Sequence, residues 1–147
     1  MIKNNQSDTE QKIIRFLHKE KILSLSTLSH QQPWSATCFF ALDSNTMTLI
    51  IQSSLDSRHI REALDNTSIS GTVYHNPGKI GHIQGIQFEA IFIKPEGFEE
   101  ERIKRIYLRK FPFASLHEGE SFVIKLLTVK MTDNKLGFGT KLNWVRS

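Results

Sequence analysis

Apolar residues first recur with helical spacing near the start of the chain. Ile13, Ile14 and Leu17 fall on one face of a helix. Ser7-Asp8-Thr9-Glu10 matches a capping box, in which a serine begins the helix and a glutamate follows three residues later. The pattern therefore predicts a helix from about Asp8 to Lys19.

The spacing then changes to the alternation that is typical of strands. Leu23 and Leu25 alternate with serines. The segment from Trp34 to Leu42 becomes apolar on both faces towards its end, which predicts a central and largely buried strand. The turn residues Asp43-Ser44-Asn45 follow, so we expect a hairpin with a third strand from Thr46 to Ser53.

The second half of the chain continues in the same way, with two helices among further strands. Gly81 and Gly85 lie inside a long strand pattern and predict bends, which closing a barrel requires. The pattern as a whole predicts a mainly β (α+β) fold with six or seven antiparallel strands in a barrel-like sheet. The expected strands are Ile69 to Val73, Ile80 to Ile93, Phe122 to Met131 and Gly137 to Val145, and the expected helices are a short one after Ser57 and Glu99 to Phe111.

Composition narrows the class of protein. The 147 residues, 39% of them hydrophobic, predict one domain over residues 1–147. Charges of both signs are mixed to a net +4, without a basic stripe, so nucleic-acid binding is not expected. Cys38 is the only cysteine, which excludes an intramolecular disulfide and a cysteine-rich zinc site. No segment reaches the ~20 apolar residues of a membrane span, and a cytoplasmic location is the simplest expectation.

The strongest candidate for chemistry is the run Gln52-Ser53-Ser54-Leu55-Asp56-Ser57-Arg58-His59. Hydroxyl residues end a strand there, and a helix opens with serine and arginine. Free amides at a helix N-terminus, together with hydroxyls and an arginine, suit a phosphate group. In the alternative interpretation Ser57 only caps the helix and Arg58 is a solvated charge. Residue types alone favour this alternative.

Other candidates are weaker, and no catalytic residue is identified. Cys38 lies in an apolar strand without a histidine nearby in sequence, so a core thiol is a better interpretation than a nucleophile. His75 and His82 flank a turn, but no third ligand has recognisable spacing, so no metal site is predicted. The Gly137-Phe138-Gly139 run has neither the third glycine nor the helix of a dinucleotide-binding fingerprint.

Longer strings in the sequence resemble a known family. The run from Thr132 to Lys141, followed by Trp144-Val145-Arg146, resembles the uncharacterised bacterial YhbP family, as do Gly85-Ile86-Gln87-Phe88 and Arg109-Lys110-Phe111-Pro112. That family looks like a branch of the pyridoxamine-phosphate-oxidase-like FMN-binding split barrels. The resemblance implies a six-stranded antiparallel split barrel with flanking helices and a homodimer that holds FMN in a cleft between subunits. It further implies a flavin-dependent oxidoreductase acting on a small molecule.

The resemblance carries over to the flavin site only in part. Ser57 and Arg58 match the family's helix start, and Ser53 keeps a hydroxyl at a threonine position. His59 stands where a lysine is usual, and Thr37 replaces a phosphate-gripping arginine. The lysine expected near Leu42 is also missing. The cofactor-binding residues that the resemblance implies are Ala36, Thr37, Gln52, Ser53, Ser54, Ser57, Arg58 and His59.

The missing cations leave an alternative open. Each lost charge-assisted hydrogen bond costs about 1.5–3 kcal/mol of binding free energy. A split barrel that has lost FMN and binds another small ligand or a protein partner in the same cleft is therefore the second hypothesis. Heme-binding relatives of this fold agree with it. The substrate and the electron donor are not indicated by the sequence.

Overall fold

The computed structural model describes residues 2–116 and 119–147, and only the backbone of residues 2–6. Within them, three α-helices pack against one sheet of eight strands, with three short 3-10 helices in the connections. The elements are α1 (Ile2–Lys19), β1 (Ile22–Ser29), β2 (Gln32–Phe39), β3 (Ala41–Asp43), β4 (Thr48–Ser53), α2 (Arg58–Asp65), β5 (Ser68–His75), η1 (Ile80–His82), β6 (Gln84–Ile93), α3 (Phe98–Lys110), η2 (Pro112–Leu116), β7 (Glu120–Asp133), η3 (Asn134–Leu136) and β8 (Lys141–Val145).

The sheet has the order β2-β1-β5-β6-β7-β4-β3, and β8 adds to β7 beyond the end of β4. Every pairing is antiparallel. The β6–β7 register shifts between Glu89 and Ala90, an irregularity that helps a sheet to curl. The expectation of a mainly β, antiparallel fold is therefore confirmed, although the described residues form eight strands instead of six.

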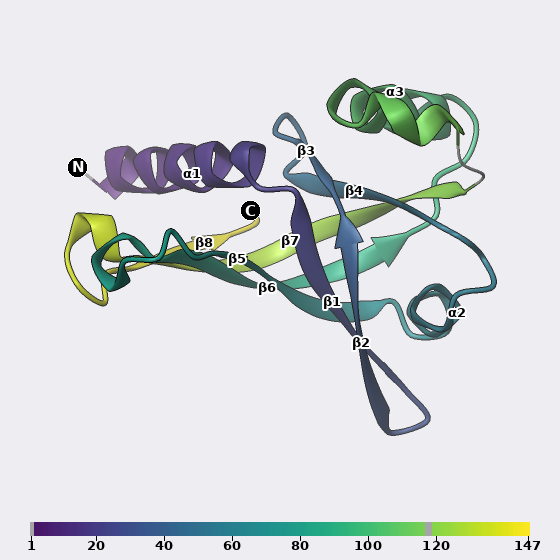
Figure 1. The fold of residues 1–147 in the computed structure, drawn as a ribbon, viewed down its shortest axis with the longest axis horizontal. Coiled ribbons are helices and arrows are strands. Elements are labelled where there is room, and N and C mark those ends of the chain that lie inside the picture. The colour runs from purple at the N-terminus through teal and green to yellow at the C-terminus, as the bar shows by residue number, and fades with distance from the viewer. Residues whose placement is uncertain (1, 117–118) are drawn as a thin grey trace.

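An additional strand arises because the predicted second strand is interrupted at Phe40. The segment predicted as one strand, Trp34 to Leu42, is split into β2 and β3, which lie at opposite edges of the sheet. The fully buried Phe40 donates its backbone amide to the Lys21 carbonyl (3.0 Å), so the two edges approach each other and the sheet forms a curled half-barrel (Figure 1).

The prediction of a central, buried strand was accordingly wrong for β2, an edge strand with mostly exposed side chains. Its C-terminal half is apolar on both faces because each face meets a different layer. Phe39 contacts the ring of Phe111 outside the sheet (centroids 5.4 Å apart), and Cys38 packs against the interior. Alternation indicates which side chains are covered, but not a strand's place in the sheet.

The main core lies inside the curled sheet and is closed by α1 and α2 (Figure 1). Ile13 and Leu17, which lie on the face predicted for α1, are fully buried there. Ile60 of α2 is fully buried in the same core. Helix α3 packs on the outer side of β3, β4 and β7 and forms a second cluster. That cluster consists of Ala41, Ile50, Ile103, Tyr107, Phe111, Ala114 and Val123.

Several predicted boundaries move. Helix α1 begins at Ile2, so the Ser7-Asp8-Thr9-Glu10 run lies inside the helix, and Asp8 pairs with Lys12 (2.9 Å) instead of starting it. Strand β6 begins only at Gln84, because η1 takes up the preceding residues. Among the helices of the described chain, none has the length and apolar character needed to cross a bilayer.

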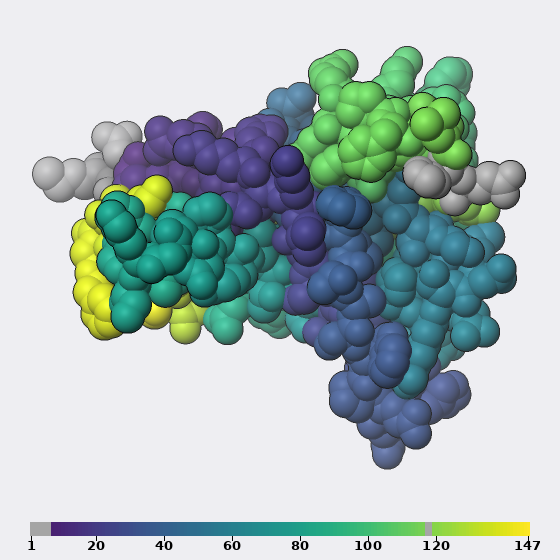
Figure 2. Space-filling model, viewed as in Figure 1, coloured from purple at the N-terminus to yellow at the C-terminus, as the bar shows by residue number. Residues whose placement is uncertain are grey.

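One face of the sheet carries no helix over most of its area. In the middle of the outward sides of β1, β2 and β5 the residues are small and polar, and two pairs of them bond across strands: Ser24 with Thr72 (2.5 Å) and Ser26 with Ser35 (3.1 Å). Exposed hydrophobic side chains, Ile22, Phe39 and Tyr74 among them, lie towards the strand ends. A shallow groove of about 570 Å³ runs over this face, from Ser26 of β1 to Val145 of β8. The β1–β2 hairpin projects beyond it as a separate lobe (Figure 2).

Candidate functional site

The predicted phosphate-binding run forms a tight turn between β4 and α2, here called the β4–α2 corner (residues 52–59). The amide of Ser57 donates to the Ser54 carbonyl (3.1 Å), and the Ser54 hydroxyl accepts from the Asp56 amide (3.2 Å). Helix α2 then begins at Arg58, with Ser57 in the N-cap position. The sequence therefore located this helix start correctly.

Ser57 occupies the cap position without capping the helix. Its side chain makes no cap hydrogen bond and instead accepts a long one from the Ser53 hydroxyl (3.5 Å). A helix begins with backbone amides that lack intrahelical acceptors, and a serine cap normally satisfies one of them. With the Ser57 hydroxyl turned towards Ser53, the amides of the first turn are left to another acceptor, such as an anion.

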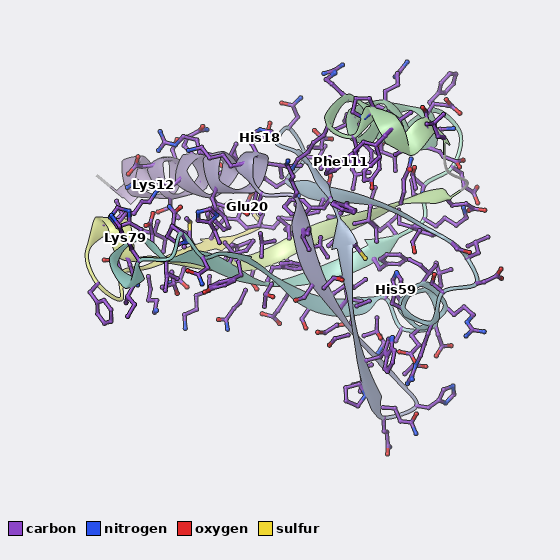
Figure 3. The ribbon with its side chains drawn as sticks, viewed as in Figure 1. Lys12, His18, Glu20, His59, Lys79 and Phe111 are labelled. Carbon is purple, nitrogen blue, oxygen red and sulfur yellow. The ribbon has the colours of Figure 1, made fainter. Side chains whose placement is uncertain are left out.

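His59 joins the corner to strand β2. Its Nε2 atom lies 3.1 Å from the Ser53 hydroxyl and 3.8 Å from the sulfur of Cys38 (Figure 3). Burial lowers the pKa of His59 and raises the pKa of Cys38 to about 11. Both groups are thus neutral near pH 7, and the thiol is not a primed nucleophile. Nothing in the local sequence indicated this contact, because the two residues are 21 positions apart on different elements.

Arg58 is held by two partners away from the turn. Its guanidinium carbon lies 4.0 Å above the ring of Trp34, and its Nε donates to Oε1 of Glu62 (2.8 Å). The other oxygen of Glu62 accepts from the hydroxyl of Thr27 (2.6 Å). The bond from Thr27, and after it the bond from Arg58, lowers the pKa of Glu62. Arg58 is therefore neither a freely solvated charge nor an unpaired cation.

Other predicted residues divide between the two faces of the sheet. Ala36 pairs with the buried Leu25 and so lies on the inward side of β2, between Trp34 and Cys38. Thr37 points the other way and is exposed. Gln52 also lies on the outer side, where its amide reaches Ser121 (3.4 Å). The corner thus gathers Ser53, Ser54, Ser57 and His59 with Ala36 nearby, and it leaves Thr37 and Gln52 on the opposite face.

The missing cations can also be placed. Leu42 is buried in the main core, where the charge of a lysine would be desolvated. The absence of a metal site at His75 and His82 stays a prediction. Nδ1 of His75 lies 2.9 Å from a carboxylate oxygen of Glu20, which would compete with a metal ion for this histidine. Within the described part of the chain, no three histidine, cysteine or carboxylate side chains form a group that could hold a metal ion.

The donor set of the corner fits one phosphate group. Three serine hydroxyls and the first-turn amides of α2 supply neutral donors, and Arg58 supplies a positive charge at the start of the helix. Neutral donors bind phosphate less strongly than charged ones.

Comparison with solved structures defines the class of fold. A heme-binding protein from Mycobacterium smegmatis superposes with a TM-score of 0.78 at 14% identity, covering 95% of this chain and 57% of that longer protein. An FAD-binding protein from Mesorhizobium loti superposes with a TM-score of 0.69 at 14% identity, covering 82% of this chain and 91% of that protein. The heme storage protein HutZ from Vibrio cholerae superposes with a TM-score of 0.59 at 18% identity, covering 80% of this chain and 89% of HutZ. At these identities the likeness shows a shared half-barrel fold.

Sequence comparison defines the family. The UPF0306 protein of Serratia proteamaculans is 35% identical over 143 residues, which is 97% of this chain and 99% of that protein. A UPF0306 protein of Yersinia pestis is 35% identical over 142 residues, 97% of each chain. No family model matches the sequence. The chain belongs to the UPF0306 family, and the narrower resemblance to YhbP stays a prediction.

Proposed function

We propose that this chain is a split-barrel flavoprotein that binds FMN at the β4–α2 corner. The observation that carries the proposal is the arrangement of Ser53 and Ser57 beside a first turn of α2 that no serine side chain caps. Backbone amides and hydroxyls at a helix start are a common phosphate site. A protein of the same fold that binds FAD supports a flavin as the ligand.

Most residues of the predicted set have a role in this proposal. Ser53, Ser54 and Ser57 donate hydrogen bonds to the phosphate, and Arg58 supplies positive charge. Ala36 lines the inner side of β2, while Thr37 and Gln52 face outward. His59 orients the Ser53 hydroxyl through its 3.1 Å contact. When bound, the flavin supplies the electron exchange with a small molecule, which makes the protein an oxidoreductase.

The proposal includes a homodimer. The outward face of β1, β5, β6 and β8 carries no helix, and its groove runs the width of these strands. Two such faces placed together would form a cleft open to Thr37 and to the polar row of Ser24 and Thr72. Sedimentation that shows a monomer at micromolar concentration would remove this part of the proposal. A cytoplasmic location is part of the proposal as well.

A second candidate is a planar ligand without a phosphate, such as heme. One observation favours it: Arg58 is engaged by Glu62, so the only cation of the corner is already partly neutralised. Proteins of the same fold from Mycobacterium smegmatis and Vibrio cholerae are described as heme-binding and heme storage proteins. In this second candidate function, the same cleft holds the planar ligand in place of the flavin.

One titration separates the two candidates. Protein purified without denaturant is titrated with FMN, riboflavin and hemin, with flavin fluorescence and the heme absorption band as signals. We expect FMN to bind more tightly than riboflavin, because only FMN carries the phosphate. Binding of hemin with no binding of either flavin would favour the second candidate, and binding of none of the three would contradict both.

A further inference from the structure

We infer that Glu62 sets the ligand preference of the β4–α2 corner by competing with the ligand's phosphate group for Arg58. The inference rests on the FMN site proposed above and adds a residue to it that the predicted set did not include. It assigns to Glu62 the role of a specificity-determining residue that weakens the binding of phosphate-bearing ligands.

The first argument is that Glu62 already engages the Arg58 guanidinium. Side chains on a helix lean towards its N-terminus, so a carboxylate four residues later reaches back to the first residue of α2. The Nε of Arg58 donates to Oε1 of Glu62 at 2.8 Å. A phosphate group at the corner therefore meets a cation whose Nε–H and charge are already paired with a carboxylate.

The second argument is that both members of the pair are anchored. Thr27, which is 3% exposed, donates to Glu62 at 2.6 Å and fixes the carboxylate to strand β1. Trp34 of β2 lies under the guanidinium at 4.0 Å. The side chain of Glu62 is only 14% exposed, so water screens its pairing with Arg58 less than it would on an open surface. The β1–β2 hairpin therefore keeps Arg58 in this position.

The consequence is a preference among ligands. A phosphate group must draw Arg58 away from Glu62 or bind beside a neutralised cation, and both reduce its affinity. A flat ligand without phosphate is indifferent to the pair. Removing the negative charge of Glu62 while keeping its shape should release Arg58 to the phosphate and so raise the affinity for FMN alone.

The test compares Glu62→Gln with the wild-type protein in titrations with FMN and riboflavin. Glutamine keeps an oxygen that accepts from Thr27, so the variant should fold, and its circular dichroism melting curve checks this. We expect the Kd for FMN to fall by roughly tenfold, the usual effect of one charge-assisted hydrogen bond, and the Kd for riboflavin to stay unchanged.

Two further variants isolate the cause. Glu99→Gln is the matched control, because Glu99 also accepts from the Nε of an arginine (Arg102, 2.8 Å) but lies on helix α3. It adds the same net charge and should leave both affinities unchanged. The double variant Arg58→Ala with Glu62→Gln should lose the gain, because the released cation is missing.

The outcomes separate the inference from the proposed function. FMN binding that is equal in wild-type protein and Glu62→Gln overturns the inference and leaves the FMN site standing. An equal gain for riboflavin, or the same gain in Glu99→Gln, also overturns it. Failure of both proteins to bind either flavin at millimolar concentration overturns the proposed site and the inference together.

Discussion

The Ser53 hydroxyl lies 3.1 Å from Nε2 of His59 and so ties the last residue of β4 to the second residue of α2. The contact spans the whole turn between the two elements. Ser53 also reaches Ser57 at 3.5 Å, which keeps the hydroxyls of the turn close together. A site held this way needs little rearrangement to bind an anion, and binding loses less free energy to the ordering of side chains.

Arg58 provides the most direct test of the phosphate site. In the Glu62→Gln background, replacing it by alanine should weaken FMN binding by roughly tenfold, since the charge-assisted hydrogen bond of the released arginine is lost. In the wild-type protein, where Glu62 engages Arg58, the loss should be smaller. Riboflavin has no phosphate, so its affinity should stay the same. Fluorescence titration with both flavins measures the difference. Arg61→Ala, which removes an exposed arginine of the same helix, is the control and should change neither affinity. Equal losses for FMN and riboflavin would contradict the assignment.

Ser57 should contribute less to stability than its position suggests. Replacing a capping serine by alanine usually costs about 1 kcal/mol of unfolding free energy. Since Ser57 makes no cap hydrogen bond, we expect Ser57→Ala to cost less than about 0.5 kcal/mol. Urea denaturation measures it. Asp133→Ala is the comparison, because the Asp133 side chain does accept from the amide of Lys135, and this variant should lose more. The reverse order would show that Ser57 is a cap.

Cys38 should react slowly with thiol reagents. Burial raises its pKa to about 11, so the reactive thiolate at pH 8 is about a hundredfold scarcer than in a free cysteine. The reaction with an aromatic disulfide reagent should therefore be slow in folded protein and fast in urea, which serves as the control. A folded protein that reacts as fast as the unfolded chain would contradict the burial of this thiol.

The same pKa predicts a dependence of stability on pH. The folded state favours the neutral thiol, so the contribution of Cys38 is complete below pH 9.0 and is lost as the pH rises towards about 11. The difference in unfolding free energy between the wild-type protein and Cys38→Ala should fall over this interval. Subtracting the variant removes the titration of other groups. A difference that is constant with pH would show that the thiol keeps an ordinary pKa.

Gly71 should not tolerate a side chain. A Cβ atom there would lie 2.2 Å from the carbonyl oxygen of Ser24 and 2.4 Å from the ring of Phe88. Because one contact is with backbone, the strand pair cannot yield easily, and we expect Gly71→Ala to cost about 3 kcal/mol of unfolding free energy. Gly81→Ala, with no atom within 4 Å of its Cβ, should be nearly neutral. Thermal unfolding of both variants gives the comparison.

Local patterns predicted the elements well and their positions in the sheet poorly. The helix expected from Glu99 to Phe111 is found as Phe98–Lys110, because helical spacing and an acidic first turn are both visible in the sequence. The strand expected from Trp34 to Leu42 is broken, since nothing local shows that β2 and β3 belong to opposite edges. That property depends on pairings with β1 and β4, which are decided by the whole chain.

The candidate site shows the same limit. Ser57 and Arg58 were found because a strand end and a helix start are visible in sequence. Glu62 also left a signal, four residues after Arg58, where opposite charges meet on a helix. The contacts of His59 with Cys38 and of Arg58 with Trp34 left none, because they join α2 to a strand more than 20 residues earlier. Only tertiary structure could reveal them.

The break at Phe40 has a consequence for how the chain folds. The hairpins β1–β2 and β3–β4 pair residues that are close in sequence, so each can form soon after it is synthesised. They can be joined into one sheet only through β5, β6 and β7, and β4 finds its partner when Ile50 meets Val123. On the ribosome, the β1–β2 hairpin can pair with β5 as soon as that strand is made, whereas the β3–β4 hairpin must wait with its apolar faces uncovered until β7 emerges. This delay leaves apolar surface exposed on the growing chain.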